Sequence, residues 1–115
     1  MNEDLNTGQM LRLHKLKGKI YYLLGITWTQ FLILCALKEL EKADSFGTTN
    51  DLIDLLEMDK VWVYRHLNVL RDIGAVTMSA KSPWTPRIVS LEYAGRLLLT
   101  RMELLLATDE PVAFD

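Results

Sequence analysis

The stretch from residue 52 to residue 76, LIDLLEMDKVWVYRHLNVLRDIGAV, decides the fold. A short apolar segment is followed by a break at Met58 and Asp59, and then by a longer segment whose apolar residues recur with helical spacing. Asp59 is a favourable N-cap and Gly74 a favourable terminator, so we expect a helix over residues 60–73. A short helix and a longer one joined by a tight turn are typical of a helix-turn-helix.

Downstream of this motif the sequence predicts a hairpin and a final helix. Residues 75–78 and 87–90 have strand character. The two prolines Pro83 and Pro86 exclude a tight two-residue turn between these strands, so the hairpin loop is long. A last helix is expected over residues 91–107.

Upstream of the motif, capping signals predict three more helices. They span residues 6–24, 27–42 and 50–57, and Gly25 ends the first of them. A polar side chain at the N-cap satisfies backbone amides that would otherwise have no partner at the start of a helix. The expected caps are Asn6 or Thr7 for the first helix, Thr27 with Gln30 for the second, and Thr48 with Asp51 for the third.

These elements fit a single domain, because 115 residues are too few for two hydrophobic cores. We expect a mainly α fold with a small β-hairpin wing, which is a winged helix-turn-helix. The expected parts of the domain at 1–115 are an N-terminal dimerisation helix at 6–24, a winged-helix core at 27–90, a C-terminal dimerisation helix at 91–107 and a flexible tail at 108–115.

The two terminal helices each carry an apolar seam that needs a partner surface. Their apolar residues recur every three or four positions along one side of the helix. On so short a chain the partner can be a second subunit, so we expect a homodimer. The predicted dimer interface comprises Leu13, Leu16, Ile20, Leu23, Leu98, Met102 and Leu105.

The charge of the chain is unevenly distributed. The formal net charge is −2, which by itself argues against a nucleic-acid partner. Residues 60–90, however, carry five basic residues and one acidic residue, whereas residues 31–59 carry two basic and seven acidic ones. Because the local potential governs encounter with a polyanion, the basic segment favours double-stranded DNA as a partner. An ordinary solvated surface is the alternative explanation.

An uncharged stretch of 18 residues, Ile20 to Leu37, reaches the length of a membrane span. Gly25, Thr27 and Gln30 interrupt it with signals that end one helix and cap the next. We therefore expect two helices that meet at a turn, no membrane partner, and a cytoplasmic protein. The alternative is a membrane-anchored form that uses this stretch.

The helix over residues 60–73 has one side suited to DNA. At about 100° per residue, Val63, Leu67 and Leu70 cluster on the expected core side. On the other side, arginine can pair with guanine, asparagine with adenine, and valine can contact a thymine methyl group. The predicted DNA contacts are Lys60, Val61, Trp62, Tyr64, Arg65 and Asn68 in the helix and Lys81 and Arg87 in the wing. An ordinary exposed helix face is the alternative, and for Trp62 and Tyr64 so is packing against neighbouring helices.

Three segments also resemble known winged-helix regulators. Residues 25–31, GITWTQF, resemble the opening of MarR-type regulators. Residues 52–76 resemble the helix-turn-helix core shared by MarR-type and ArsR-type regulators, and the RHL at 65–67 is especially ArsR-like. Residues 89–96, VSLEYAGR, resemble the MarR-type entry into the last helix.

This resemblance implies a homodimer that binds a pseudo-palindromic operator and represses transcription, often with relief by a small-molecule effector. It implies DNA contacts at the same helix residues and at Arg87 in the wing. The chain departs from the MarR-type pattern there, because Thr85 and Pro86 precede a single arginine instead of an aspartate and paired arginines. It also lacks the long final helices and the ArsR-type metal-sensing cysteine pair, so we expect no metal.

The chain contains no enzymatic motif such as a glycine-rich phosphate loop, a nucleophile elbow or a zinc motif, and we expect no cofactor. His66 is expected to be a hydrogen-bonded, half-buried residue and Cys35 a small core residue. The sequence therefore predicts a sequence-specific DNA-binding protein that regulates transcription. The alternative is a winged-helix module for protein–protein contact that has no operator.

Overall fold

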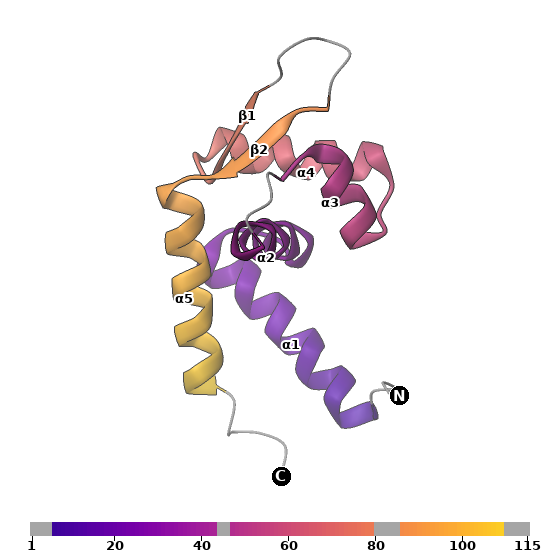
Figure 1. The fold of residues 1–115 in the computed structure, drawn as a ribbon. Helices are drawn as coiled ribbons and strands as arrows, with labels where there is room; N and C mark the ends of the chain where they lie inside the picture. Colours follow the sequence, from indigo (N-terminus) through magenta and orange to yellow (C-terminus); the bar gives the residue numbers. More distant parts are fainter. Residues whose placement is uncertain (1–5, 44–46, 80–85, 110–115) are drawn as a thin grey trace.

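The computed structural model describes residues 6–43, 47–79 and 86–109, the last four of them by their backbone alone. Within these ranges, five helices and a two-stranded hairpin follow one another in the predicted order, which confirms a mainly α winged helix-turn-helix (Figure 1). The elements are α1 (Thr7–Leu24), α2 (Trp28–Lys42), α3 (Thr49–Leu56), α4 (Lys60–Asp72), β1 (Val76–Ser79), β2 (Ile88–Leu91) and α5 (Tyr93–Asp109).

The predicted capping residues begin the first three helices. Asn6 is the N-cap of α1. At the start of α2, the backbone amide of Gln30 donates to Thr27 Oγ1 at 3.2 Å, and the backbone amide of Thr27 donates to Gln30 Oε1 at 3.0 Å. The same reciprocal pair joins Thr48 and Asp51 at the start of α3. These bonds satisfy amides at the helix start, so the chain enters each helix at a defined residue.

Gly25 separates α1 from α2, as predicted, and it adopts the left-handed conformation with φ 75°. The two helices are bent by 85° at this break, which confirms that the uncharged stretch forms two helices. Within the described ranges, no single helix is long and apolar enough to cross a membrane. α1 and α2 reach the required length and composition only as this bent pair.

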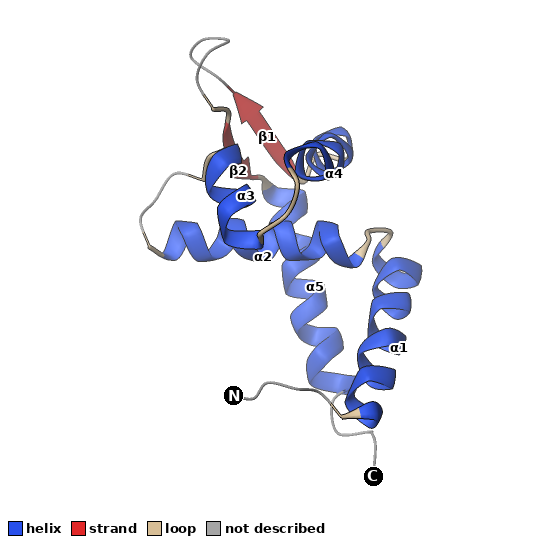
Figure 2. Cartoon of the chain, turned by 90° about the vertical axis from the view of Figure 1, so that its right-hand side faces the viewer, coloured by secondary structure: helices blue, strands red, loops and turns tan. Residues whose placement is uncertain are grey.

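The helix α2 lies at the centre of the molecule (Figures 1 and 2). The hairpin, α3 and α4 lie on one side of it, and α1 and α5 extend away on the other side. The strands are antiparallel, with Val76 opposite Leu91. The Thr49 amide donates to the Arg87 carbonyl oxygen at 2.9 Å, so the chain that enters α3 is fastened to the residue that precedes β2.

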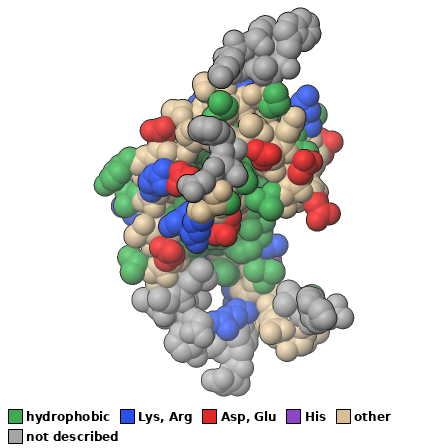
Figure 3. All heavy atoms as spheres, viewed as in Figure 1, with side chains coloured by type: hydrophobic (Ala, Val, Ile, Leu, Met, Phe, Trp, Pro, Cys, Tyr) green, Lys and Arg blue, Asp and Glu red, His purple; other side chains and the backbone are tan. Residues whose placement is uncertain are grey.

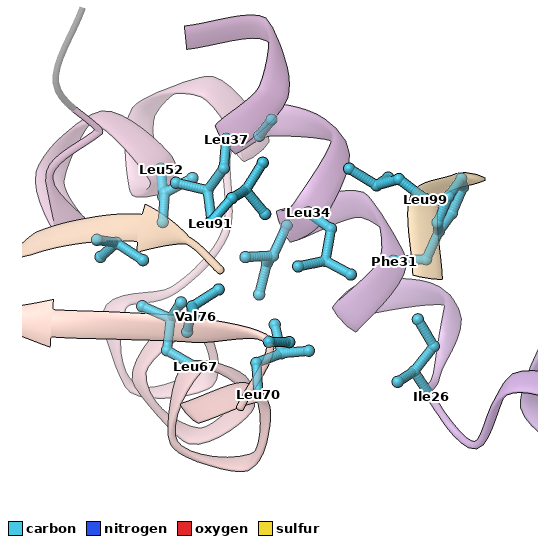
Figure 4. Close-up of a cluster of buried hydrophobic side chains, with 14 of the residues drawn as sticks. Ile26, Phe31, Leu34, Leu37, Leu52, Leu67, Leu70, Val76, Leu91 and Leu99 are labelled. Carbon is cyan, nitrogen blue, oxygen red and sulfur yellow. The ribbon is translucent and has the colours of Figure 1, made fainter. Parts of the chain in front are cut away.

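One hydrophobic core joins both sides of the molecule to α2 (Figure 4). Ile33 and Leu34 of α2 are fully buried, and side chains from the other elements converge on them. This core fixes α4 relative to the hairpin, which is the arrangement on which any DNA-reading surface depends. Its further members include Ile26, Phe31, Leu37, Leu52, Val63, Leu67, Leu70, Val76, Leu91 and Leu99.

The structure corrects two sequence-based assignments. Leu91, expected at the start of the last helix, ends β2, and it is buried opposite Val76. Ile20 and Met102, predicted at a dimer interface, are buried in the core of a single chain. They therefore have no surface left to offer to a second subunit.

Candidate nucleic-acid interface

The two sides of α4 differ as the helical periodicity predicts. Val63, Leu67 and Leu70 are fully buried and hold the helix against the core. The opposite side, which we term the reading face, is exposed and comprises Lys60, Val61, Arg65 and Asn68. Together with Tyr64, these residues line a shallow hollow of about 440 Å³. The reading face thus presents two cations and an amide on a helix whose buried side is fixed against the core.

The turn between α3 and α4 sets the start of the reading face. Glu57 ends α3 in the left-handed conformation with φ 52°, which reverses the chain within a few residues. Asp59 caps α4, and its Oδ2 accepts a hydrogen bond from the Val61 amide at 3.0 Å. This bond fixes Asp59 at the start of α4, so the helix begins at Lys60 and the position of the Lys60 backbone is defined.

Tyr64, predicted to contact DNA, also has a structural role. Its hydroxyl donates to Thr49 Oγ1 at 3.1 Å, and Thr49 is buried. This bond ties α4 to the first residue of α3. The Tyr64 hydroxyl therefore contacts a neighbouring helix, which was the alternative to a DNA contact. A hydroxyl already engaged in this way is less available for a base edge than the side chains of the reading face.

Trp62 lies on the edge of the reading face and is 51% exposed. The guanidinium carbon of Arg65 lies 5.0 Å from the centroid of its ring, within the range of a cation–π contact. The imidazole of His66 lies 5.9 Å from the same ring, and the two planes make an angle of 21°. The indole therefore packs against two side chains of its own helix.

His66 is half-buried and hydrogen-bonded, as the sequence predicts. Its Nδ1 lies 3.2 Å from Nε2 of Gln30. The Oε1 of that glutamine already accepts from the Thr27 amide, which leaves its NH₂ group to face the imidazole. His66 Nδ1 is therefore the acceptor, and the neutral ring carries its proton on Nε2. Burial, with the positive charge of Arg65, lowers the pKa of His66.

We expect this histidine to make stability fall in mild acid. Because the pKa of His66 is lower in the folded chain than its usual value of about 6.5, the unfolded chain binds more protons as the pH falls below that value. The free energy of unfolding should therefore be larger at pH 7.5 than at pH 5.5. Urea titrations at both pH values would measure it, and His66→Gln should reduce the difference. An equal pH dependence in the variant would contradict this role.

The wing contributes one described residue to the predicted contacts. Arg87 is exposed just before β2, and its backbone carbonyl holds the Thr49 amide. The side chain therefore extends from a fixed point where the wing loop enters β2. Lys81, the other predicted wing contact, and Trp84 lie outside the described residues.

Away from the reading face, opposite charges lie close together. On the face shown in Figure 3, acidic and basic side chains are interspersed. Arg96 of α5 makes two hydrogen bonds, of 2.8 and 2.5 Å, to the carboxylate of Glu41 in α2. This bond lowers the pKa of Glu41. Sequence reasoning missed the pair because the residues are 55 positions apart, and it ties α5 to α2 without adding to the reading face.

Cys35 is half-buried and packs against the core, as predicted. Burial raises the pKa of its thiol, so the protonated form prevails near neutral pH. In the part of the chain that the structure describes, no three histidine, cysteine, aspartate or glutamate side chains come together as a metal site.

Comparison with known proteins places this arrangement among solved winged-helix structures. The DNA complex of MepR from S. aureus matches with a TM-score of 0.70 and 17% identity over 91% of this chain and 79% of that one. MarR from E. coli, without ligand, matches with a TM-score of 0.65 and 22% identity over 92% of this chain and 79% of that one. A MarR variant in complex with operator DNA has a TM-score of 0.64 and 21% identity over 88% and 74% of the two chains. No family model and no curated protein matches the chain.

The described residues thus form a winged helix-turn-helix of the MarR type. The sequence resemblance to MarR-type regulators predicted this fold, and the structural matches confirm it. MepR is itself described as a transcription regulator of a multidrug efflux pump. The ArsR-like character of residues 65–67 stays a prediction.

Proposed function

We propose that this chain binds double-stranded DNA sequence-specifically as a homodimer and regulates transcription, acting as a repressor in the cytoplasm. The reading face of α4 carries the proposal. It exposes Arg65 and Asn68 on a helix whose other side is locked into the core, and a helix of this kind fits the major groove.

Each residue of the reading face has a chemical role in this proposal. The Arg65 guanidinium can donate two parallel hydrogen bonds to O6 and N7 of guanine, and the Asn68 amide can pair with N6 and N7 of adenine. Val61 is 62% exposed and suits a thymine methyl group. Lys60 and Arg87 suit phosphates, which set the register on the duplex without reading its sequence.

The DNA complexes of MepR and of the MarR variant support this proposal. Both proteins have a fold similar to that of this chain, with TM-scores of 0.70 and 0.64, and both structures contain DNA. They support DNA as the class of partner.

The homodimer is proposed from the outer surface of α1. Leu11 and Tyr22 lie on the same side of α1, with Tyr21 and Leu23 on its two flanks, and all four are more than half exposed. Exposed apolar side chains gathered in this way mark an interaction site. α1 and α5 extend from α2 on the side away from the hairpin (Figure 2). A second copy can join there and leave both reading faces uncovered. Of the interface residues predicted from the sequence, Leu23 is exposed, and Leu13, Leu16, Leu98 and Leu105 are half-buried.

A small-molecule effector is the remaining partner in the proposal. A cavity of about 350 Å³ lies between α2 and α5, with Phe31, Leu99 and Met102 in its lining and charged side chains around them. A cavity of this size, apolar inside with a few polar groups, suits a small ligand. A ligand there would contact α2, which joins α1 and its proposed dimer surface to the core of the winged helix.

A module for protein–protein contact is the second candidate. The observation that favours it is the number of exposed apolar side chains on α4, where Trp62 and Val69 accompany Val61. Affinity for DNA and its dependence on salt separate the two functions, because counterion release accompanies phosphate contacts.

We expect binding to duplex DNA that weakens steeply with salt. For about six phosphate contacts per dimer, the association constant should fall about 10³-fold between 50 and 200 mM salt. Selection of bound sequences from random duplexes, followed by fluorescence anisotropy at several salt concentrations, would measure this. The selected sites should contain two inverted half-sites if the chain binds as a homodimer.

Three results would contradict parts of the proposal. Absence of binding at low salt, or an affinity that does not change with salt, would favour the protein-contact module. Selected sites with a single half-site would contradict the homodimer, and DNA would still be the partner. The experiment therefore tests the partner, the specificity and the assembly separately.

A further inference from the structure

We propose that Trp62 is a positioning residue, whose indole ring holds the guanidinium of Arg65 on the reading face in the orientation that reads a base. The inference rests on the proposed function and names the residue that sets its specificity. It assigns a use to an indole that is half exposed on the DNA-facing helix.

The spacing along α4 brings three side chains together. Residues three and four positions apart are neighbours on a helix surface, so Arg65 and His66 both reach the ring of Trp62. The guanidinium lies 5.0 Å from the ring centroid, and the imidazole lies 5.9 Å away in a nearly parallel plane. The indole therefore contacts the reading arginine and a more deeply placed residue at the same time.

The deeper end of this stack is anchored outside α4. His66 Nδ1 accepts from Gln30 Nε2 at 3.2 Å, and Gln30 is buried at the start of α2. The orientation of the Gln30 amide is fixed in turn by Thr27, whose backbone amide donates to Oε1. The ring of Trp62 thus rests on the His66 imidazole, whose position and tautomer are set by the buried Gln30 and its hydrogen bond to Thr27.

Such a platform matters because a solvent-exposed arginine has many rotamers. Binding a base edge requires one of them, and the freedom lost on binding weakens the complex. A guanidinium that already lies against an aromatic ring loses less conformational freedom on binding. Its planar group is also held in one orientation, as a bidentate contact requires. Trp62 would therefore increase discrimination at the base that Arg65 reads, without contacting that base.

A double-mutant cycle separates positioning from direct contact. The first probe is the duplex recovered by selection from random sequences. The second is the same duplex with one guanine replaced, at the position where the Arg65→Ala variant has lost its preference for guanine. Trp62→Leu should weaken binding about two- to fivefold per recognition helix and reduce discrimination at that base. In the Arg65→Ala background, Trp62→Leu should have no further effect. Trp62→Phe should retain part of the discrimination, and Val69→Ala, an exposed apolar change on the same helix, should leave it unchanged.

Independent effects of the two substitutions would overturn the inference, because they would mean that the indole contacts DNA itself or only supports the fold. A second measurement needs no DNA. In the NMR spectrum of the unbound chain, the Arg65 side-chain protons should show an upfield ring-current shift that Trp62→Leu abolishes and Trp62→Phe partly keeps. Absence of that shift would overturn the contact between Trp62 and Arg65. Failure of the wild-type chain to bind any duplex would overturn the proposed function instead. In that case the ring-current measurement alone would decide whether the contact exists.

Discussion

Gly95→Ala should destabilise the fold by about 3 kcal/mol, the upper part of the range for forced overpacking. A Cβ at this position would lie 2.3 Å from the backbone oxygen of Ala75 and 3.2 Å from a methyl group of Leu91. The oxygen belongs to the chain that enters β1, and it accepts a hydrogen bond from the Glu92 amide at 3.0 Å. The start of α5 could admit a methyl group only by moving away from the hairpin and breaking that bond.

Gly18→Ala is the matched control, because the chemical change is identical and the position is also helical. A Cβ there meets nothing within 4 Å, and Gly18 is exposed in the middle of α1. Alanine should therefore stabilise the chain by about 0.5–1 kcal/mol through its helix propensity. Urea denaturation of the three proteins would measure both effects. A loss below 1 kcal/mol in Gly95→Ala would show that α5 does not approach β1 as closely as the structure has it.

The sequence predicted the elements well where the signal is local. A cap needs only residues three positions apart, so Thr27 with Gln30 and Thr48 with Asp51 could be recognised from their spacing. The burial of Val63 followed from the periodicity of a single helix. The glycine of the segment at 89–96 was recognised by resemblance, and its physical reason, the close approach of Ala75, became visible only in three dimensions.

Contacts between distant residues could not be predicted in this way. Gln30 and His66 are 36 positions apart, and nothing in the spacing of either residue indicates the other. The burial of Ile20 was predictable as an apolar position, but one seam cannot tell whether it packs on its own chain or on a second one. Pattern arguments assign a side chain to a face, and only the tertiary arrangement says what covers that face.

Arg65→Ala should produce the largest loss of function that one exposed side chain can cause here. Removing a bidentate contact to guanine costs about 1–3 kcal/mol per recognition helix. A dimer carries the change twice, so the loss of binding free energy should reach about 2–6 kcal/mol when both half-sites are occupied. The side chain is exposed and its described partner is Trp62, so stability should change by about 0.5 kcal/mol or less.

Two further variants show whether the loss comes from base reading or from charge. Arg65→Lys keeps the charge and removes the planar fork, so it should lose discrimination at one base pair while its salt dependence stays close to that of the wild type. Arg71→Ala removes a cation from the same helix, next to Asp72 and outside the reading face, and should leave discrimination unchanged. Anisotropy titrations with the selected duplex and its single-base variants would measure all three. If Arg65→Ala and Arg71→Ala weakened binding equally on every duplex, the reading face would act through charge alone, and Arg65 would not be the residue that specifies the operator.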